Sequence, residues 1–132
     1  MKDKVPDASS NFQSTLPVSS DFILKLLTEF EISFQLFEHA PLRTVTDSKK
    51  VEGLFLSTEQ GGGHIKNLYL RDHKKRNILL VTEQDRKIDL KTLPALLGTG
   101  RLSFGSAERL FENLGVRPGA VTPLSMITGV SH

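Results

Sequence analysis

The sequence contains no cysteine and no long uninterrupted apolar run. Without cysteine the chain cannot form disulfides, thiolate nucleophiles, thiolate zinc sites or iron–sulfur clusters, and it suits a reducing cytoplasm. A membrane-spanning helix needs about 20 consecutive apolar residues, and the polar N-terminus has no apolar segment typical of an export signal. We therefore expect a soluble, cytoplasmic protein.

Charge of either sign is also modest, because 17 lysines and arginines face 15 aspartates and glutamates. A net charge of +2 is too small to indicate a nucleic-acid-binding protein by itself. The length of 132 residues favours one domain. Residues 1–17 are rich in serine and proline and poor in large apolar side chains, so we predict a flexible N-terminal tail followed by one domain over residues 18–132.

Four segments have the apolar spacing, caps or stops of helices. They are a helix from Ser19 or Ser20 through Phe30, a short helix from Thr46 or Asp47 to Val51, a helix over 89–97 that Pro94 shortens and Gly98 ends, and a helix capped by Ser106 that ends at Gly115. The spacing of apolar residues in each segment predicts one buried stripe per helix.

Three other regions have the period of strands. The alternation of Ile32, Phe34 and Leu36 predicts a strand ending near His39, and residues 102–104 alternate briefly. The β-prone runs 64–71 and 77–82, separated by a short polar stretch, predict a hairpin whose second strand is apolar on both faces and so is covered on both sides. Together these elements predict an α+β fold with a largely antiparallel or mixed sheet.

Several kinds of chemistry are absent from the sequence. The four histidines lack the spacing of metal ligands on one helix face, and no G-x-S-x-G serine motif occurs. The glycine triplet at 61–63 lacks the following Lys-Ser or Lys-Thr of a phosphate-binding loop, so we interpret it as a flexible connector. We therefore expect neither a metal nor a cofactor.

The predicted hairpin concentrates positive charge, because residues 64–77 hold five lysines or arginines against only Asp72. This makes a phosphate-bearing partner plausible. We interpret Lys74, Lys75 and Arg76 as a solvated tip. Lys66 lies on the strand face that carries Leu68 and Leu70. A lysine beside an apolar pocket is costly unless it binds an anion, pairs with a carboxylate or extends its charge to solvent.

Residues 115–123 form a second candidate site. Pro118 and Pro123 restrict the backbone of this loop, whereas Gly115 and Gly119 permit unusual dihedral angles. Such a loop can expose backbone N–H groups in a fixed arrangement, as an oxyanion hole requires. A purely structural crossover loop is the alternative.

Three ordered blocks resemble a known family: His64–Asp72 (HIKNLYLRD), Arg101–Leu110 (RLSFGSAERL) and the loop Gly115–Pro123. They are similar to the freestanding prolyl-tRNA editing proteins of the YbaK and prolyl-tRNA synthetase editing-domain superfamily. The branch that hydrolyses alanyl-tRNA(Pro) looks most similar. The resemblance extends from about Phe22 to about Ile127, and it includes His39-Ala40-Pro41 and Thr44-Val45.

The resemblance implies an α+β domain with a mixed, barrel-like sheet surrounded by helices and a pocket for the terminal adenosine with its aminoacyl group. Lys66 would engage phosphate at the 3′ end of the tRNA, and the G-x-x-x-P loop would position the ester and the attacking water. The residues implied in catalysis are Lys66, Gly119, Ala120, Val121, Thr122 and Pro123, and those implied in substrate binding are Asn67, Thr44, Arg71, Phe104 and Gly105.

The sequence departs from the family pattern at two places. Residues 54–63 are longer and richer in glycine than the usual approach to the lysine strand. Members also usually continue past the G-x-x-x-P loop with a further strand, a helix and closing strands, so we expect this chain to lack closing elements of the sheet. An unpaired sheet edge and exposed apolar surface would follow.

From these observations we expect a cytoplasmic deacylase that acts in trans on mischarged tRNA(Pro), most specifically alanyl-tRNA(Pro), without metal or cofactor. Its expected partners are the acceptor end of that tRNA and, in addition, prolyl-tRNA synthetase or translation factors, with no membrane or DNA partner. A noncatalytic module that binds a tRNA acceptor end or a protein is the main alternative. Hydrolysis of a small activated ester is a second alternative, which the basic hairpin disfavours.

Overall fold

The computed structural model describes residues 15–40 and 45–128. A β-hairpin organises them: β1 (Ile65–Asp72) pairs antiparallel with β2 (Asn77–Glu83), with Lys66 opposite Thr82 and Leu70 opposite Ile78. The short strand β3 (Leu102–Phe104) pairs with the other edge of β1, only over Leu70–Asp72. The first half of β1 therefore has no strand partner on that edge among the described residues.

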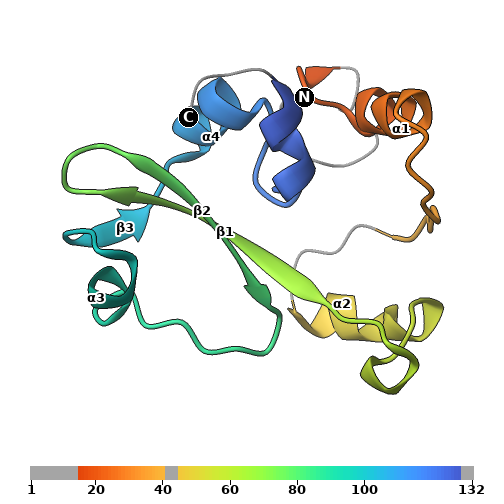
Figure 1. The fold of residues 1–132 in the computed structure, drawn as a ribbon, viewed down its shortest axis with the longest axis horizontal. Helices are drawn as coiled ribbons and strands as arrows, with labels where there is room; N and C mark the ends of the chain where they lie inside the picture. Colours follow the sequence, from red (N-terminus) through yellow and green to blue (C-terminus); the bar gives the residue numbers. More distant parts are fainter. Residues whose placement is uncertain (1–14, 41–44, 129–132) are drawn as a thin grey trace, which may run out of the picture.

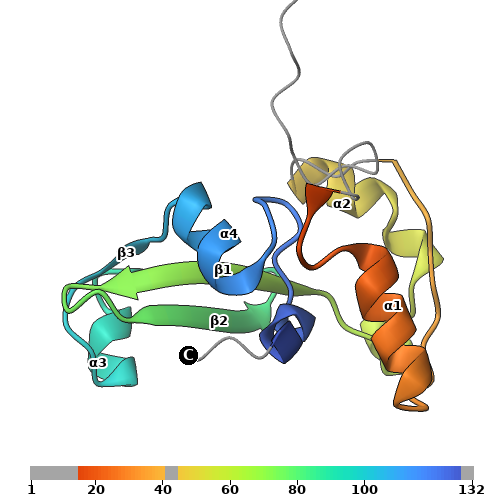
Figure 2. The same cartoon turned by 90° about the horizontal axis from the view of Figure 1, so that it is seen from above.

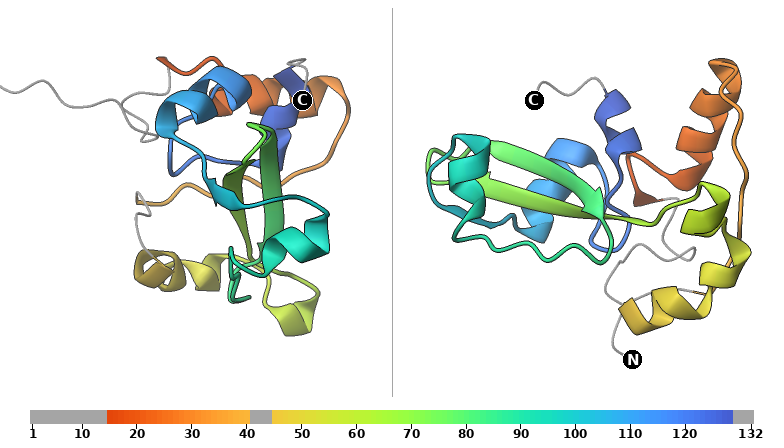
Figure 3. Two further views of the ribbon diagram at one scale, coloured as in Figure 1. Left: turned by 90° about the vertical axis from the view of Figure 1, so that its left-hand side faces the viewer. Right: turned by 60° about the horizontal axis from the view of Figure 1, so that its bottom comes forward.

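Helices cover the two faces of this sheet. The α-helices are α1 (Ser20–Glu29), α2 (Val45–Lys50), α3 (Leu93–Leu97) and α4 (Ala107–Leu114), and the 3-10 turns are η2 (Glu52–Leu54), η3 (Thr58–Gln60) and η4 (Pro123–Thr128). In Figure 1, α4 and η4 lie on one side of the hairpin and α3 lies on the other. Figures 2 and 3 show α1 and α2 beyond the end where β1 begins, away from the turn between β1 and β2.

Each face of the sheet has its own apolar core. On the α4 face, Tyr69 packs with Val18, Leu110, Leu114 and Val116, while on the α3 face Leu70 packs with Leu93 and Leu102. Leu79 joins the first cluster, and Ile78 and Leu80 join the second, so the apolar strand β2 is covered on both faces as its sequence predicts.

Local signals determine the ends of two helices. The Ser19 side chain accepts the N–H of Phe22 at the start of α1, and the Ser106 side chain accepts the N–H of Arg109 at the start of α4. Helix α4 ends at Gly115, which has φ +67° and whose carbonyl accepts the N–H of Val18 at 3.1 Å. The predicted helix boundaries at both positions are confirmed.

The strand predicted over residues 32–39 is wrong, because these residues form neither strand nor bridge. The side chains of Ile32, Phe34 and Leu36 are 51%, 44% and 59% exposed. Alternation supplies a suitable face, but a strand also needs an edge to pair with, and none is available to this segment among the described residues. Phe37, at its end, instead packs edge-on against Phe55, with ring centroids 5.0 Å apart.

The helix predicted over 89–97 is shorter in the structure. Residues before Leu93 form a turn in which the carbonyl of Asp89 accepts the N–H groups of Thr92 and Leu93. Pro94 lies at the start of α3, where its missing N–H costs nothing, and Gly98 ends the helix. The proline therefore begins the helix that it was expected only to limit.

The α+β class is confirmed, whereas the described sheet has three strands and does not close into a barrel. Most of the predicted tail, residues 1–14, lies outside the described residues. Leu16, at the end of that predicted tail, is buried, and the hydroxyl of Thr15 accepts a hydrogen bond from Arg117 at 2.6 Å. This end of the predicted tail is therefore packed against the domain.

Candidate active site at the open edge of β1

Lys66 lies on the α3 face of β1, in line with Leu68 and Leu70 as the alternation predicts. Its Nζ donates a hydrogen bond to the backbone carbonyl of Arg86, at 2.5 Å. Arg86 belongs to the loop that leaves β2 and crosses this face of the sheet before Ile88 and Leu90 join the apolar cluster. The ammonium group is therefore held by a neutral acceptor and is not paired with a carboxylate.

Asn67 points to the opposite face of the same strand. Its Nδ2 donates to the carbonyl of Val121 at 3.0 Å, which joins β1 to the G-x-x-x-P loop across 54 residues of sequence. The other amide atom, Oδ1, is buried and has no hydrogen-bond partner among the described residues. A buried carbonyl oxygen without a donor is unusual, so Asn67 has one acceptor available beside the loop.

The G-x-x-x-P loop itself is a series of tight turns. Gly119 has φ +95°, a conformation that side-chain-bearing residues rarely adopt, and the N–H of Ala120 donates to the carbonyl of Arg117. Thr122 accepts the N–H and hydroxyl of buried Ser125 at its carbonyl, and the N–H of Leu124 at its hydroxyl. Within the described ranges the N–H groups of Gly119, Val121 and Thr122 have no hydrogen-bond partner.

These features meet where β1 has no partner strand. Between Ile65 and Leu68 one edge of β1 is unpaired in the described part of the chain, the G-x-x-x-P loop adjoins one face and the loop after β2 adjoins the other. A ligand at this edge would reach unbonded backbone donors on one side and lysine on the other. This arrangement suits an ester with an adjoining anionic group.

The other predicted site residues lie farther away or outside the structure. Arg71 and Phe104 are on the β3-paired half of the sheet, about 16 Å along β1 from Lys66 at roughly 3.3 Å per residue. Gly105 donates its N–H to the carbonyl of Tyr69, two residues from Asn67. Thr44 lies outside the described residues. The structure thus brings together Lys66, Asn67 and residues 119–123, and it does not bring Arg71 or Phe104 to them.

The turn between β1 and β2 is organised by Asp72, whose side chain is fully buried. Its Oδ1 accepts the N–H groups of Lys74 and Arg76, and its Oδ2 accepts Nε of Arg76 at 2.6 Å. Burial would raise the pKa of Asp72, but the backbone and side chain of Arg76 and the N–H of Lys74 outweigh it and hold the pKa below its ordinary value.

Two groups of residues were not found by sequence reasoning. Arg86 and Lys87 follow β2 and reach the level of Lys66 only because β1 and β2 are antiparallel. A second group links α4 to the hairpin: Tyr69 donates to Asn77 at 2.7 Å, Asn77 also accepts from Arg109, and Asn113 donates to Tyr69. The charged run Glu83–Lys87 was the only sequence signal for the first group.

In the parts of the chain that the structure describes, no three histidine, aspartate or glutamate side chains gather as a metal site would require. In the same residues, no helix has the length and apolarity needed to cross a membrane. The candidate site is thus built from lysine, amide and backbone groups alone.

Comparison with known proteins identifies relatives of this arrangement. The profile of a family described as the aminoacyl-tRNA editing domain matches residues 39–131. The prolyl-tRNA editing protein ProX of Acetoanaerobium sticklandii is 38% identical over 106 residues, which are 80% of this chain and 62% of that protein. The prolyl-tRNA synthetase associated domain-containing protein 1 of Mus musculus is 46% identical over 68 residues, covering 49% of this chain and 40% of the mouse protein.

Similarity to solved structures supports the fold. The crystal structure of hypothetical protein APE2540 superimposes with a TM-score of 0.59 and 19% sequence identity, covering 78% of this chain and 65% of that one. This chain therefore spans less than two thirds of the length of each of these relatives. The sequence matches include both the lysine strand and the G-x-x-x-P loop within residues 39–131.

Proposed function

The chain belongs to the aminoacyl-tRNA editing domain family of YbaK-like editing proteins, and we propose that it hydrolyses mischarged aminoacyl-tRNA(Pro), with alanyl-tRNA(Pro) as its substrate. The products would be free amino acid and tRNA. An aminoacyl ester is already activated, so hydrolysis needs mainly a positioned water molecule and a polarised carbonyl. A side-chain nucleophile is not required.

The observation that carries this proposal is the hydrogen bond from Asn67 to Val121, which holds the G-x-x-x-P loop against the strand that bears Lys66. The unbonded N–H groups of Gly119, Val121 and Thr122 are candidate donors to the ester carbonyl oxygen. In other acyl-transfer enzymes, losing one such donor costs about 2.7–4 kcal/mol of transition-state stabilisation. Backbone donors held in a fixed loop can therefore supply much of the catalysis.

In the proposed reaction, water attacks the carbonyl carbon of the ester and the developing oxyanion accepts hydrogen bonds from the loop. The bond between that carbon and the ribose oxygen then breaks, the ribose hydroxyl takes up a proton, and the amino acid leaves as a carboxylate. A ribose hydroxyl of the substrate orients the water, as the family resemblance implies. No group of the chain is consumed.

Lys66 would bind the phosphate next to the terminal adenosine. An ammonium group has three donors, and the carbonyl of Arg86 uses one of them, so the others remain for an anion. Because Lys66 and Asn67 point to opposite faces, the substrate would cross the unpaired edge of β1, with its ester on one face and its phosphate on the other. The unbonded Oδ1 of Asn67 would accept a hydrogen bond from the substrate.

Selection of alanine is proposed from the family resemblance, with pocket size excluding larger side chains more readily than smaller ones. Arg71, Phe104, Gly105 and Thr44 stay proposed substrate-binding residues. We also propose a cytoplasmic location and an association with prolyl-tRNA synthetase, which the names of the vertebrate relatives support. The barrel-like closure proposed for the sheet would require pairing at the free edge of β2 or at the unpaired half of β1.

A deacylation panel tests the proposed function. Alanyl-, cysteinyl-, seryl- and prolyl-tRNA(Pro) are incubated with the protein, and the remaining ester is measured over time against buffer alone. We expect the alanyl ester to be hydrolysed fastest. Binding of tRNA without acceleration of any ester would contradict the proposal and favour the noncatalytic acceptor-binding alternative.

A further inference from the structure

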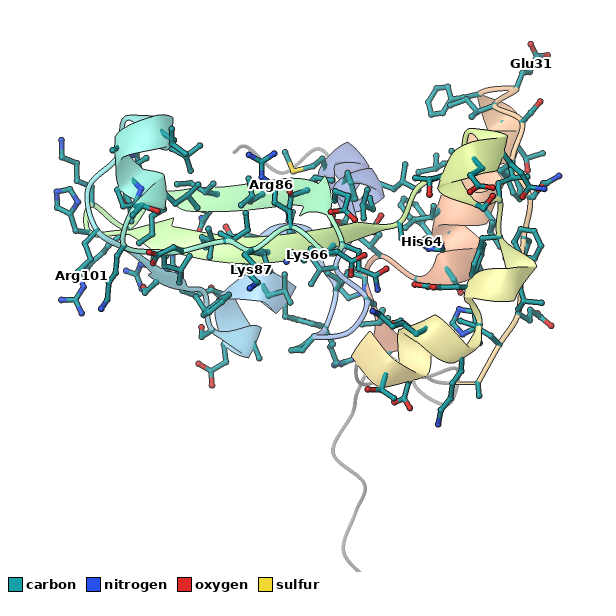
Figure 4. The ribbon with its side chains drawn as sticks, turned by 90° about the horizontal axis from the view of Figure 1, so that it is seen from below. Glu31, His64, Lys66, Arg86, Lys87 and Arg101 are labelled. Carbon is teal, nitrogen blue, oxygen red and sulfur yellow. The ribbon has the colours of Figure 1, made fainter. Side chains whose placement is uncertain are left out.

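The loop that joins β2 to α3 brings a second set of cations to the position of Lys66. Arg86 and Lys87 are both exposed and lie in the turn that follows β2. In Figure 4 they are labelled in the same central part of the molecule as Lys66, whereas Arg101 is labelled at the far end. The carbonyl of Arg86 accepts Nζ of Lys66, so the loop backbone and the Lys66 side chain are in direct contact.

The position of this loop is determined by several bonds. Gln84 donates its N–H to the carbonyl of His64, just before β1, and the N–H of Asp85 donates to the side chain of Glu83. The N–H of Arg86 donates to the carbonyl of Glu83. Beyond the cations, Ile88 packs into the apolar cluster of the α3 face. The two cationic side chains thus project from a turn that is anchored at both ends.

Few carboxylates neutralise this surface. Asp85 lies 4.0 Å from Lys49 of α2, with both side chains more than half exposed, so that pair is weak. Glu83 is engaged by the N–H of Asp85. Among the described residues, no ion pair within 4.0 Å involves Lys66, Arg86 or Lys87. Three cations converge here without an anion of the chain to match them.

We propose that Arg86 and Lys87 bind phosphodiester groups of single-stranded RNA, extending the phosphate site of Lys66 away from the ester. The proposal rests on the proposed function, because it places the nucleotides that precede the terminal adenosine along this loop. Arginine and lysine are the residues that contact phosphate, by bidentate hydrogen bonds and by point charge respectively. These contacts contribute affinity and orientation without reading bases.

The test uses the double variant Arg86→Gln/Lys87→Gln and, as a matched control, Lys74→Gln/Lys75→Gln, which removes the same charge from the hairpin turn. The side-chain changes leave the carbonyl that accepts Lys66 in place. Binding of a fluorescein-labelled ACCA oligoribonucleotide is followed by anisotropy at several salt concentrations, together with its deoxyribose counterpart. Circular dichroism and thermal melting confirm that each variant folds.

We expect the first double variant to bind the oligoribonucleotide about tenfold more weakly at low salt, with a salt dependence flatter by about 0.7 in log–log slope per lost phosphate contact. The loss should be equal for the deoxyribose form, because the contacts are made to phosphate. The control should lose less than about threefold. Equal losses in the two double variants, an unchanged slope, or no measurable binding by the parent would overturn the proposal.

The same proteins in the alanyl-tRNA(Pro) assay separate this inference from the proposed function. If the parent deacylates and the Arg86→Gln/Lys87→Gln variant has parental binding and turnover, the inference fails and the function stands. If the parent does not deacylate but its oligonucleotide binding depends on Arg86 and Lys87, the phosphodiester site stands and the function fails.

Discussion

The two ends of the β1–β2 hairpin both carry clustered cations, but they use them differently. At the turn, Arg76 is committed to the buried carboxylate of Asp72, and the backbone N–H groups of Lys74 and Arg76 bind the same carboxylate. At the end where β1 begins, Lys66 is held only by a backbone carbonyl, and Arg86 and Lys87 project beside it. A local count of charge therefore does not locate a binding site.

The difference has a structural cause. The turn is closed by a left-handed residue, Lys75 at φ +66°, and needs a buried acceptor to satisfy its N–H groups. The other end has no turn to close, and its neighbours are two loops that come from distant parts of the sequence. The turn thus uses its polar groups for stability, whereas the open end leaves its donors for a ligand. Each prediction below tests this division.

Gly119→Val should have the largest effect on activity. The native φ of +95° is strained for any side chain, and a β-branched residue also stiffens the loop that we propose to polarise the ester. Loss of one loop donor predicts roughly a hundred- to thousandfold lower deacylation rate. The rate is measured under single-turnover conditions with alanyl-tRNA(Pro).

Binding of tRNA by Gly119→Val should stay close to that of the parent, because the cations at Lys66, Arg86 and Lys87 are untouched. Circular dichroism checks the fold. A folded variant that turns over at the parental rate would show that the loop is only a structural connection.

Lys66→Ala should have the next largest effect. A phosphate contact at a partly buried site loses a charge-assisted hydrogen bond of about 1.5–3 kcal/mol, or roughly ten- to a hundredfold in affinity or rate. Lys74→Ala and Lys75→Ala, at the exposed turn, should each cost less and act mainly through salt-screened attraction.

The three lysine variants are compared by tRNA binding and single-turnover deacylation at two salt concentrations. Since all three changes remove the same charge, position alone distinguishes them. Small and equal losses at the three positions would remove the distinction between the two ends of the hairpin.

Asn67→Ala should reduce turnover more moderately. It removes one neutral hydrogen bond to Val121, worth about 0.5–1.5 kcal/mol, or roughly two- to tenfold. Because the bond positions the loop and not the phosphates, kcat should fall while KM changes little. A rise in KM with unchanged kcat would instead indicate that Asn67 contributes only to binding.

Asp72→Asn should affect stability without affecting turnover measured well below the melting temperature. The carboxylate has a lowered pKa in the folded state, so its stabilising contribution is present above the unfolded value of about 3.9 and is lost as the pH falls through the folded pKa. The melting temperature of the parent should therefore fall below about pH 4.

The Asn variant should melt at a lower temperature than the parent at pH 7, and the difference between the two should shrink as the pH is lowered. Thermal melts between pH 2.5 and 7 measure this. A constant difference across that range would mean that the charge of Asp72 does not stabilise the turn.

Much of the fold was predictable because its signals are local. The serine caps of α1 and α4, the glycine stops after α3 and α4, and the two alternating runs of the hairpin each depend on residues within one turn or one strand. The alternation also placed Lys66 and Asn67 on opposite faces correctly. The strand at 32–39 failed because pairing depends on a distant edge, which the period of a segment does not specify.

The sequence by itself determined where the chain turns, which residues cap its helices and which side chains share a face of β1, because backbone sterics and side-chain period act over a few residues. Only the tertiary structure decided that Val121 meets Asn67 and that Arg86 meets Lys66, across 54 and 20 residues respectively. Such contacts depend on how the α4 and α3 layers pack on the two faces of one sheet, since burial of apolar surface is not directional and no local pattern encodes its partner.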